Sequence, residues 1–154
     1  TGRKQLTVLH PQLRRAFKPH EIAYLRACDL GRLATIQPDG TPQNSPVGFT
    51  YNEELGTIDI AGYRMSQSRK YRNIAHNNRV AFVVDDIFSR DPWRVRCLEI
   101  RGTAEQVVTS AAKGAAGDDL DAAIIRITPR RIISFGIDDQ ETPPHQLEAD
   151  IRTV

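Results

Sequence analysis

Cysteine and long apolar runs are both scarce in this chain of 154 residues. Its two cysteines, Cys28 and Cys97, lie far apart without a CxxC partner. This spacing excludes a thiolate metal motif and a framework of several disulfides. A single disulfide bond between the two cysteines is the alternative left open. No apolar run approaches the roughly 18–20 residues of a membrane span, and no apolar core of a signal peptide is present. We therefore expect reduced thiols, a cytoplasmic location and no membrane partner.

A charge excess of one sign is also missing. Lys and Arg number 21 against 19 for Asp and Glu, which gives a formal net charge of +2, and the two signs are interleaved. This distribution does not favour a nucleic-acid partner. The apolar share of 40% is ordinary for a globular chain, and the length fits a single domain over 1–154.

Motifs for metal or nucleophilic chemistry are absent as well. The four histidines fall in no ligand pattern, so we expect no metal site, and no GxSxG, Walker or GxGxxG motif occurs. Asp85–Asp86 and a cluster at 118–121 could be acid–base pairs, but a strand end and a solvated loop are the favoured interpretations. An enzyme of this kind usually takes its chemistry from a cofactor.

The pattern of apolar residues and turns predicts a mostly β domain with small helices. Short strands joined by tight turns indicate an antiparallel sheet that closes on itself. A basic arm is expected at 1–18 and a loosely ordered tail at 139–154. Between them the pattern predicts helices at 19–28, 69–76 and, interrupted by a loop, 109–124, and strands at 32–37, 43–51, 57–63, 79–86, 95–107, 125–129 and 130–138.

Three local features refine these strands. Pro46 cannot donate a ladder hydrogen bond, which places 43–51 at an edge or a bulge. The run 79–86 is nearly all apolar, which is typical of a strand buried on both faces. Gly102 predicts a bend or bulge in the long strand 95–107.

The segment 66–79, SQSRKYRNIAHNNR, carries an electrostatic anomaly. Ser68 is a good N-cap for a short helix, yet Arg69, Lys70 and Arg72 crowd its first turn. Cations at this positive end of the helix dipole cost about 0.3–1 kcal/mol each. A cap hydroxyl, free N–H groups and clustered cations together predict an anion site, with phosphate as the obvious ligand. A solvated basic helix face is the alternative.

Five segments identify a resemblance that covers about residues 20–138: LATIQPDGTPQNSPV, SRKYRNI, NNRVAFVVDD, EIRGTAE and ITPRRIISFGID. In this order they resemble the pyridoxamine 5'-phosphate oxidase-like superfamily of FMN-binding split β-barrels, and in particular its actinobacterial branch. The expected cofactor of that branch is the deazaflavin coenzyme F420. The resemblance implies a split β-barrel, a homodimer and two cofactor sites at the dimer interface.

Carried over residue by residue, the resemblance also implies a site. Ser68, Arg69 and Lys70 would hold the cofactor phosphate. Trp93 would come from a loop near the interface, although a buried core indole is an equal alternative. Tyr63 is a weak candidate proton donor because it lies near the expected ring, and a structural tyrosine is the favoured interpretation. The backbone along the ring edge and the strand end beside the ring would come from Asn44, Ser45, Pro46 and Val47, and from Ile60, Ala61 and Gly62.

One departure from the family pattern shapes the expected function. The true pyridoxamine phosphate oxidases open their second strand with an arginine, where this chain has Gln43, and this places vitamin B6 oxidation in doubt. We expect an F420-dependent oxidoreductase that transfers a hydride to an electron-poor double bond of a small molecule, such as an enone, a quinone or a tetrapyrrole bridge. A polyketide enone is one such acceptor. The alternatives are an FMN-dependent oxidase or reductase and a carrier of flavin or haem.

Overall fold

The computed structural model describes residues 16–109 and 121–154. The helix expected at 109–124 falls mainly outside these ranges, and so does most of the expected arm. None of the described helices is long and apolar enough to cross a membrane. The elements are α1 (Pro19–Ala27), β1 (Leu30–Ile36), β2 (Pro42–Gly48), β3 (Thr50–Asn52), β4 (Thr57–Ile60), η2 (Met65–Gln67), α2 (Arg69–His76), β5 (Arg79–Arg90), β6 (Trp93–Val108), β7 (Ala123–Phe135), η4 (Pro144–Gln146) and β8 (Asp150–Thr153).

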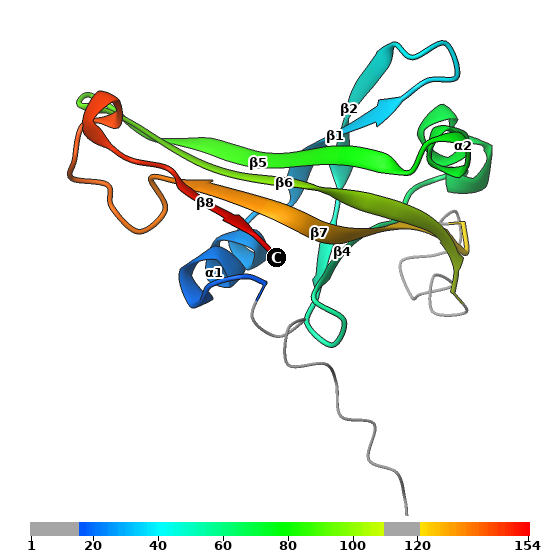
Figure 1. The fold of residues 1–154 in the computed structure, drawn as a ribbon. Coiled ribbons are helices and arrows are strands. Elements are labelled where there is room, and N and C mark those ends of the chain that lie inside the picture. Colours follow the sequence, from blue (N-terminus) through cyan, green and yellow to red (C-terminus); the bar gives the residue numbers. More distant parts are fainter. Residues whose placement is uncertain (1–15, 110–120) are drawn as a thin grey trace, which may run out of the picture.

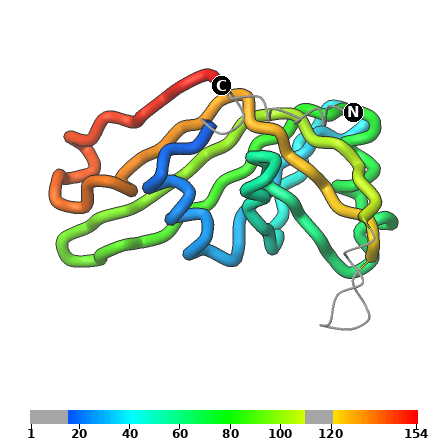
Figure 2. The backbone as a smooth tube through the Cα atoms, turned by 90° about the horizontal axis from the view of Figure 1, so that it is seen from below, coloured from blue at the N-terminus to red at the C-terminus, as the bar shows by residue number. Residues whose placement is uncertain are grey.

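The described strands form one antiparallel sheet in the order β2-β1-β5-β6-β7-β4-β3, with β8 added to β7 (Figure 1). β2 and β3 stand at opposite ends of this order, yet only Phe49 separates them along the chain. The sheet must therefore curl until its two ends approach each other. Figure 2 shows the β5–β6 hairpin extending beyond the rolled part. The mostly β architecture is confirmed, and it is consistent with a split β-barrel.

Alternate strand residues fill the interior of the rolled sheet. β5 differs from the prediction, because Val80, Phe82 and Val84 are buried while Ala81 and Val83 stay partly exposed. One face of a curled sheet looks into the core and the other looks outward, so an apolar run is only half buried in this protomer. The core is built from residues at most 1% exposed, among them Leu33, Ile58, Ile60, Phe82, Leu98, Ile100, Ile125, Ile127 and Ile132.

Two strand boundaries also differ from expectation. The strand predicted at 43–51 breaks at Phe49 into β2 and β3, because the chain leaves one end of the sheet there and joins the other. The strand predicted at 57–63 ends at Ile60. Pro46 lies on β2, an edge strand that pairs only with β1 among the described residues, as its missing N–H predicts.

The two ends of the described chain pack against the rest of the fold. The strand β8 corrects the prediction of a loosely ordered tail over 139–154, whereas only residues 16–18 of the arm predicted over 1–18 are described. Ala16 and Phe17 are buried, and β8 pairs with β7. Arg152 on β8 donates to the carbonyl oxygen of Ala16 at 2.6 Å and to the carboxylate of Glu21 on α1 at 3.0 Å. Glu21 is fully buried, so its charge depends on this partner, and the pair joins the two ends.

A β-bulge bends the ladder between β6 and β7. The register passes from Arg101 opposite Arg131 to Gly102 opposite Pro129, which leaves Arg130 without a partner on β6. The chain therefore continues past Pro129 in one strand. The two strands predicted at 125–129 and 130–138 are in fact the single strand β7.

Gly102 is required at this bulge, as its sequence position predicts. A Cβ at Gly102 would lie 2.1 Å from the carbonyl oxygen of Thr128, far inside any real contact. The neighbouring backbone of β7 would have to move to accept any other residue. The glycine therefore fixes both the bend of β6 and the close approach of β7.

We predict that Gly102→Ala lowers the free energy of unfolding by about 1–3 kcal/mol, the usual cost of overpacking. Gly48→Ala is the matched control, because its Cβ would meet nothing closer than the carbonyl oxygen of Asp29 at 3.9 Å. We expect the control to stay within about 0.5 kcal/mol of the parent protein in urea unfolding. Equal losses in the two variants would contradict the steric account of the bulge.

Candidate functional site

The first turn of α2 has the cap, helix start and clustered cations from which the sequence predicts an anion site. The helix spans Arg69–His76, and the Ser68 hydroxyl accepts a bond from the Tyr71 N–H at 3.3 Å. The same hydroxyl donates to the carbonyl oxygen of Met65 at 2.7 Å. Ser68 therefore holds the turn in shape, while the N–H groups of Arg69 and Lys70 have no acceptor among the described residues.

The cations of this turn are not neutralised by carboxylates in the described ranges. Arg69, Lys70 and Arg72 form no salt bridge with any described residue, and Arg69 donates only to the side-chain oxygen of Gln37 at 3.3 Å. Their positive charge adds to that of the helix dipole. An anion bound there would relieve both sources of repulsion.

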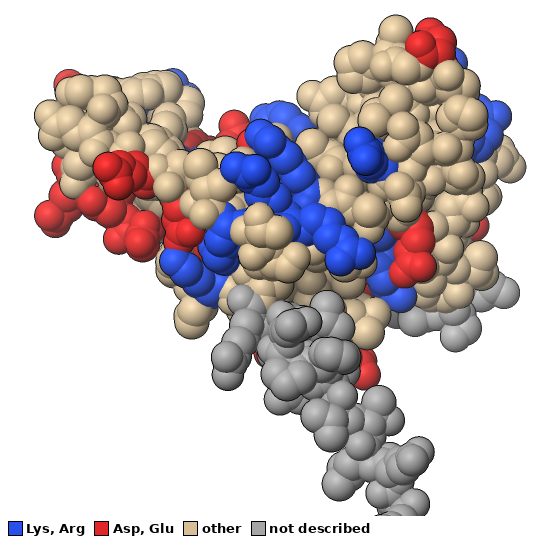
Figure 3. Space-filling model, in the orientation of Figure 1, with Lys and Arg blue, Asp and Glu red and all other residues tan. Residues whose placement is uncertain are grey.

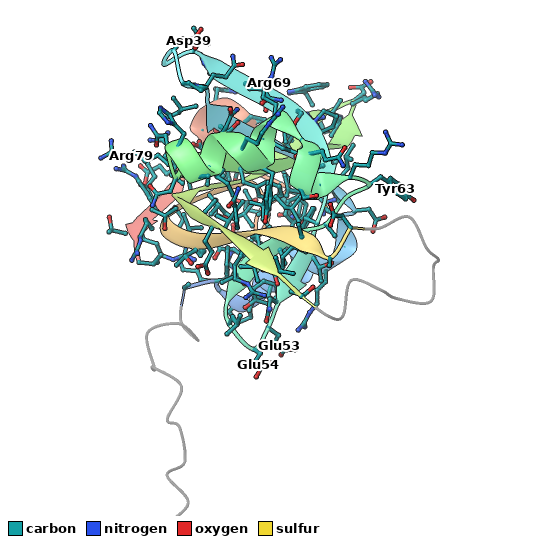
Figure 4. The ribbon with its side chains drawn as sticks, turned by 90° about the vertical axis from the view of Figure 1, so that its right-hand side faces the viewer. Asp39, Glu53, Glu54, Tyr63, Arg69 and Arg79 are labelled. Atoms are coloured by element: carbon teal, nitrogen blue, oxygen red, sulfur yellow. The ribbon has the colours of Figure 1, made fainter. Side chains whose placement is uncertain are left out.

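A hollow of about 530 Å³ lies between this turn and the β1–β2 turn. Figure 4 shows Arg69 at the same end of the molecule as Asp39 of that turn, with Tyr63 projecting elsewhere. Hydrogen bonds from Thr41 hold the pKa of Asp39 below its usual range, so an anion here meets one carboxylate beside two guanidinium groups. The lining residues are Gln37, Pro38, Asp39, Arg69, Arg72 and Asn73.

Arg72, one of the three cations from which the sequence predicts the anion site, lines this hollow, whereas Lys70 does not. Arg69 and Arg72 are three positions apart, which places them on one helix face. Asn73 also lines the hollow, and it was not among the predicted site residues. Asn73 is buried and donates to Thr35 and Gln43, both at 3.0 Å. No pattern in the sequence points to that contact.

On β2, the four predicted residues alternate between the two faces of the sheet. Asn44 and Pro46 are exposed, while Val47 is buried and Ser45 is partly buried. The Ser45 hydroxyl oxygen is buried without a hydrogen-bond partner among the described residues. Because β2 is an edge strand, its outer backbone edge is open to a ligand, as the prediction for these residues requires.

The predicted strand end at 60–62 lies near the same helix. Ile60 is fully buried, so only its backbone could face a ligand, whereas Ala61 is exposed. A Cβ on Gly62 would lie 3.3 Å from the terminal methyl of Met65, the residue whose carbonyl oxygen binds Ser68. β2 and this segment therefore both border α2.

The remaining two candidates stand apart from this group. Tyr63 is 75% exposed and has no hydrogen bond from its hydroxyl within the described ranges. Trp93 opens β6 at the β5–β6 turn, at the opposite end of the molecule from α2 (Figure 1). Its indole is 50% exposed, so the alternative of a buried core indole is wrong.

Several ionisable side chains away from α2 have structural partners or are buried. Arg96 donates to Asp86 and holds the pKa of that carboxyl below its usual range, and Arg32 pairs with Asp85. Burial, with smaller contributions from nearby carboxylates, raises the pKa of the Cys97 thiol to about 11, so it stays protonated at neutral pH. These groups are not placed for proton transfer or nucleophilic attack near pH 7.

Comparison with known proteins places the chain in a family. The family model for pyridoxamine 5'-phosphate oxidase matches residues 17–140. The 5a,11a-dehydrotetracycline/5a,11a-dehydrooxytetracycline reductase of Streptomyces rimosus is 48% identical over 132 residues, which are 84% of this chain and 90% of that relative. The chain therefore belongs to the pyridoxamine 5'-phosphate oxidase family, and it is an oxidoreductase.

Solved structures agree with this fold. A conserved hypothetical protein from Mycobacterium tuberculosis superimposes with a TM-score of 0.62 at 22% identity, covering 82% of this chain and 89% of that one. A heme binding protein from Mycobacterium smegmatis gives a TM-score of 0.63 at 18% identity, covering 89% of this chain and 59% of that one. At these identities the likeness shows the split β-barrel fold alone.

The donor set at α2 is chemically suited to the phosphate of a flavin-type cofactor. The donors are two guanidinium groups, one ammonium group and two first-turn N–H groups. None of these groups can accept a hydrogen bond from another. Phosphate, with several acceptor oxygens, can satisfy this number of donors.

We predict that Arg72→Gln weakens the binding of phosphorylated flavins by roughly ten- to a hundred-fold, the loss of one charge-assisted contact. Lys70→Ala should act in the same direction. Thermal stability of the cofactor-free protein should hold or rise, because the crowding of cations is relieved. Fluorescence titration and thermal unfolding measure the two effects.

Arg131→Gln is the control for this experiment. Arg131 is an exposed cation on β7 and forms no salt bridge with a described residue. We expect it to leave the dissociation constant unchanged. If the α2 variants also left it unchanged, the first turn would be a solvated basic surface.

Proposed function

We propose that this protein is a reductase that uses the deazaflavin coenzyme F420 to deliver a hydride to an electron-poor carbon–carbon double bond of a fused-ring polyketide. The observation that carries the proposal is the 48% identity with a dehydrotetracycline reductase over most of both chains. The anion hollow at α2 supports a phosphorylated cofactor. The substrate class agrees with the enone expected from the sequence.

The protein's own residues act by binding and orientation. Arg69, Lys70 and Arg72 would hold the phosphate end of the cofactor, and the edge strand β2 would lie along its ring. When bound, the deazaflavin supplies the hydride from its C5 position. Positioning of the two reactants then accounts for much of the rate enhancement, because no described side chain is poised for acid–base chemistry.

Reduction of the double bond also needs one proton at the carbon that does not receive the hydride. Tyr63 is the nearest candidate by sequence, on the segment that joins β4 to α2, and its high exposure makes exchange with solvent direct. Water can supply the proton equally well at such a position. We therefore assign no essential proton donor to the chain.

The proposal is tested by cofactor preference and turnover. Oxidised F420 and FMN are titrated separately by fluorescence, and we expect the deazaflavin to bind more tightly. Consumption of reduced F420 is then followed by absorbance with 5a,11a-dehydrotetracycline as acceptor. We expect turnover that depends on both compounds, with a product two hydrogen atoms heavier by mass spectrometry.

Other results would select the alternatives. Tight FMN binding with oxygen consumption and no deazaflavin binding would identify an FMN oxidase. Tight binding of either flavin, or of haem, without turnover on any acceptor would identify a carrier. Either outcome contradicts the reductase proposal.

We also propose that the protein is a cytoplasmic homodimer with two cofactor sites at the interface. Large apolar side chains are exposed at the far end of the β5–β6 hairpin, namely Ile87, Phe88 and Trp93. A symmetric partner is a common means of covering such a surface. Light scattering at micromolar concentration should give twice the chain mass of 17.3 kDa, and a monomeric mass would contradict the proposal.

A further inference from the structure

A second hollow, of about 450 Å³, lies on the outward face of the sheet. It occupies the face of β1 that carries Ala34 and Ile36, opposite to the face where Thr35 meets α2. Small residues form a flat apolar floor, and no carboxylate is part of the described lining. The lining residues are Ala34, Thr35, Ile36, Pro42, Arg79, Val80, Ala81, Arg101, Gly102, Thr103 and Arg130.

Three arginines border this apolar floor, from three strands. Arg101 on β6 pairs with Glu99 at 2.6 Å, but Arg79 on β5 and Arg130 on β7 form no salt bridge with any described residue. Figure 3 shows Lys and Arg side chains gathered across the middle of the face that Figure 1 presents. Within the described ranges, two of the three arginines are therefore free to pair with an anion at this surface.

The β-bulge places the third arginine. Arg130 is the residue that the register skips between Pro129 and Arg131, so it is an extra outward position on β7. Without the bulge, the strict alternation of β7 would bring only one of Arg130 and Arg131 to the outward face. The close approach that Gly102 permits therefore also sets the charge of the hollow.

The hollow is continuous with the expected ring site. A smaller hollow of about 240 Å³ shares Ala34 and Ala81 with it and reaches Asn44 on β2. Asn44 is one of the residues expected beside the cofactor ring. The smaller hollow is also lined by Arg32 and Glu99, so the surface from Asn44 to the arginines is an apolar floor of Ala34 and Ala81 with charged side chains at its border. A flat molecule could lie along this floor.

We infer that this floor binds the acceptor substrate, with its apolar rings over Ala34 and Ala81 and an ionised oxygen held by Arg79 and Arg130. This inference rests on the proposed reductase function. The substrate class is a fused-ring compound that carries a carboxylate or an enolate remote from the double bond that is reduced. Arginine suits such planar, delocalised anions because it offers paired donors.

The test measures binding without turnover. Tetracycline, which carries an ionised enolate on a fused-ring body, is titrated by fluorescence into the protein alone and into the protein saturated with oxidised F420 or FMN. Arg130→Gln should weaken its binding about ten-fold. Arg131→Gln is the matched control, since Arg131 is the next residue on β7, is exposed, and does not line the hollow. It should leave the affinity unchanged.

Three further measurements make the result specific. Both flavins should bind Arg130→Gln with unchanged affinity, its mass by light scattering should equal that of the parent, and its thermal unfolding should be normal. If Arg130→Gln unfolds, Arg79→Gln takes its place in the same titrations. Binding of tetracycline that depends on Arg130 without reductase turnover would support this site while contradicting the proposed function.

Several outcomes would overturn the inference. A selective loss of deazaflavin binding would show that the arginines hold the anionic tail of the cofactor. A fall in mass to that of one chain would show that a second copy covers the hollow. Equal tetracycline affinity in Arg130→Gln and Arg131→Gln would show that no anion is bound there.

Discussion

The buried amide of Asn73 decides where the cations of α2 lie. Its nitrogen donates to Thr35 on β1 and to Gln43 on β2, and a buried amide that lost these bonds would cost about 1–3 kcal/mol. The helix is therefore held against the β1–β2 hairpin in one position. Arg69 reaches Gln37 of the adjoining turn as a result, and the anion hollow lies between the two elements.

Local chemistry in the sequence predicted the elements that depend on single residues. Ser68 gave the start of α2, because its hydroxyl caps the helix, and the helix occupies the predicted range. Pro46 predicted that β2 is an edge strand, and Gly102 predicted the bulge between β6 and β7. In each case the side chain, or its absence, restricts the backbone directly, so no knowledge of distant residues is needed.

Features that depend on contacts distant in sequence could not be predicted in this way. β8 forms because β7 offers a free edge and because Arg152 reaches Glu21, which is 131 residues away. Nothing within the tail itself encodes that partner. Of the residues predicted to hold the phosphate, Arg69 lines the hollow. Gln37 and Asn73 also line it, and they come together only because the β1–β2 turn packs against α2.

The two hollows share one physical property, which is positive charge held without a carboxylate partner. In a chain with nearly equal numbers of acidic and basic residues, pairing every guanidinium group would be easy, and Arg32, Arg96 and Arg126 are paired. At α2 a helix start crowded with cations departs from the favoured charge pattern, and at β7 a bulge adds an arginine to the outward face. Such departures lower stability unless a ligand compensates for them. The fold therefore places uncompensated positive charge at both surfaces that border the expected cofactor ring.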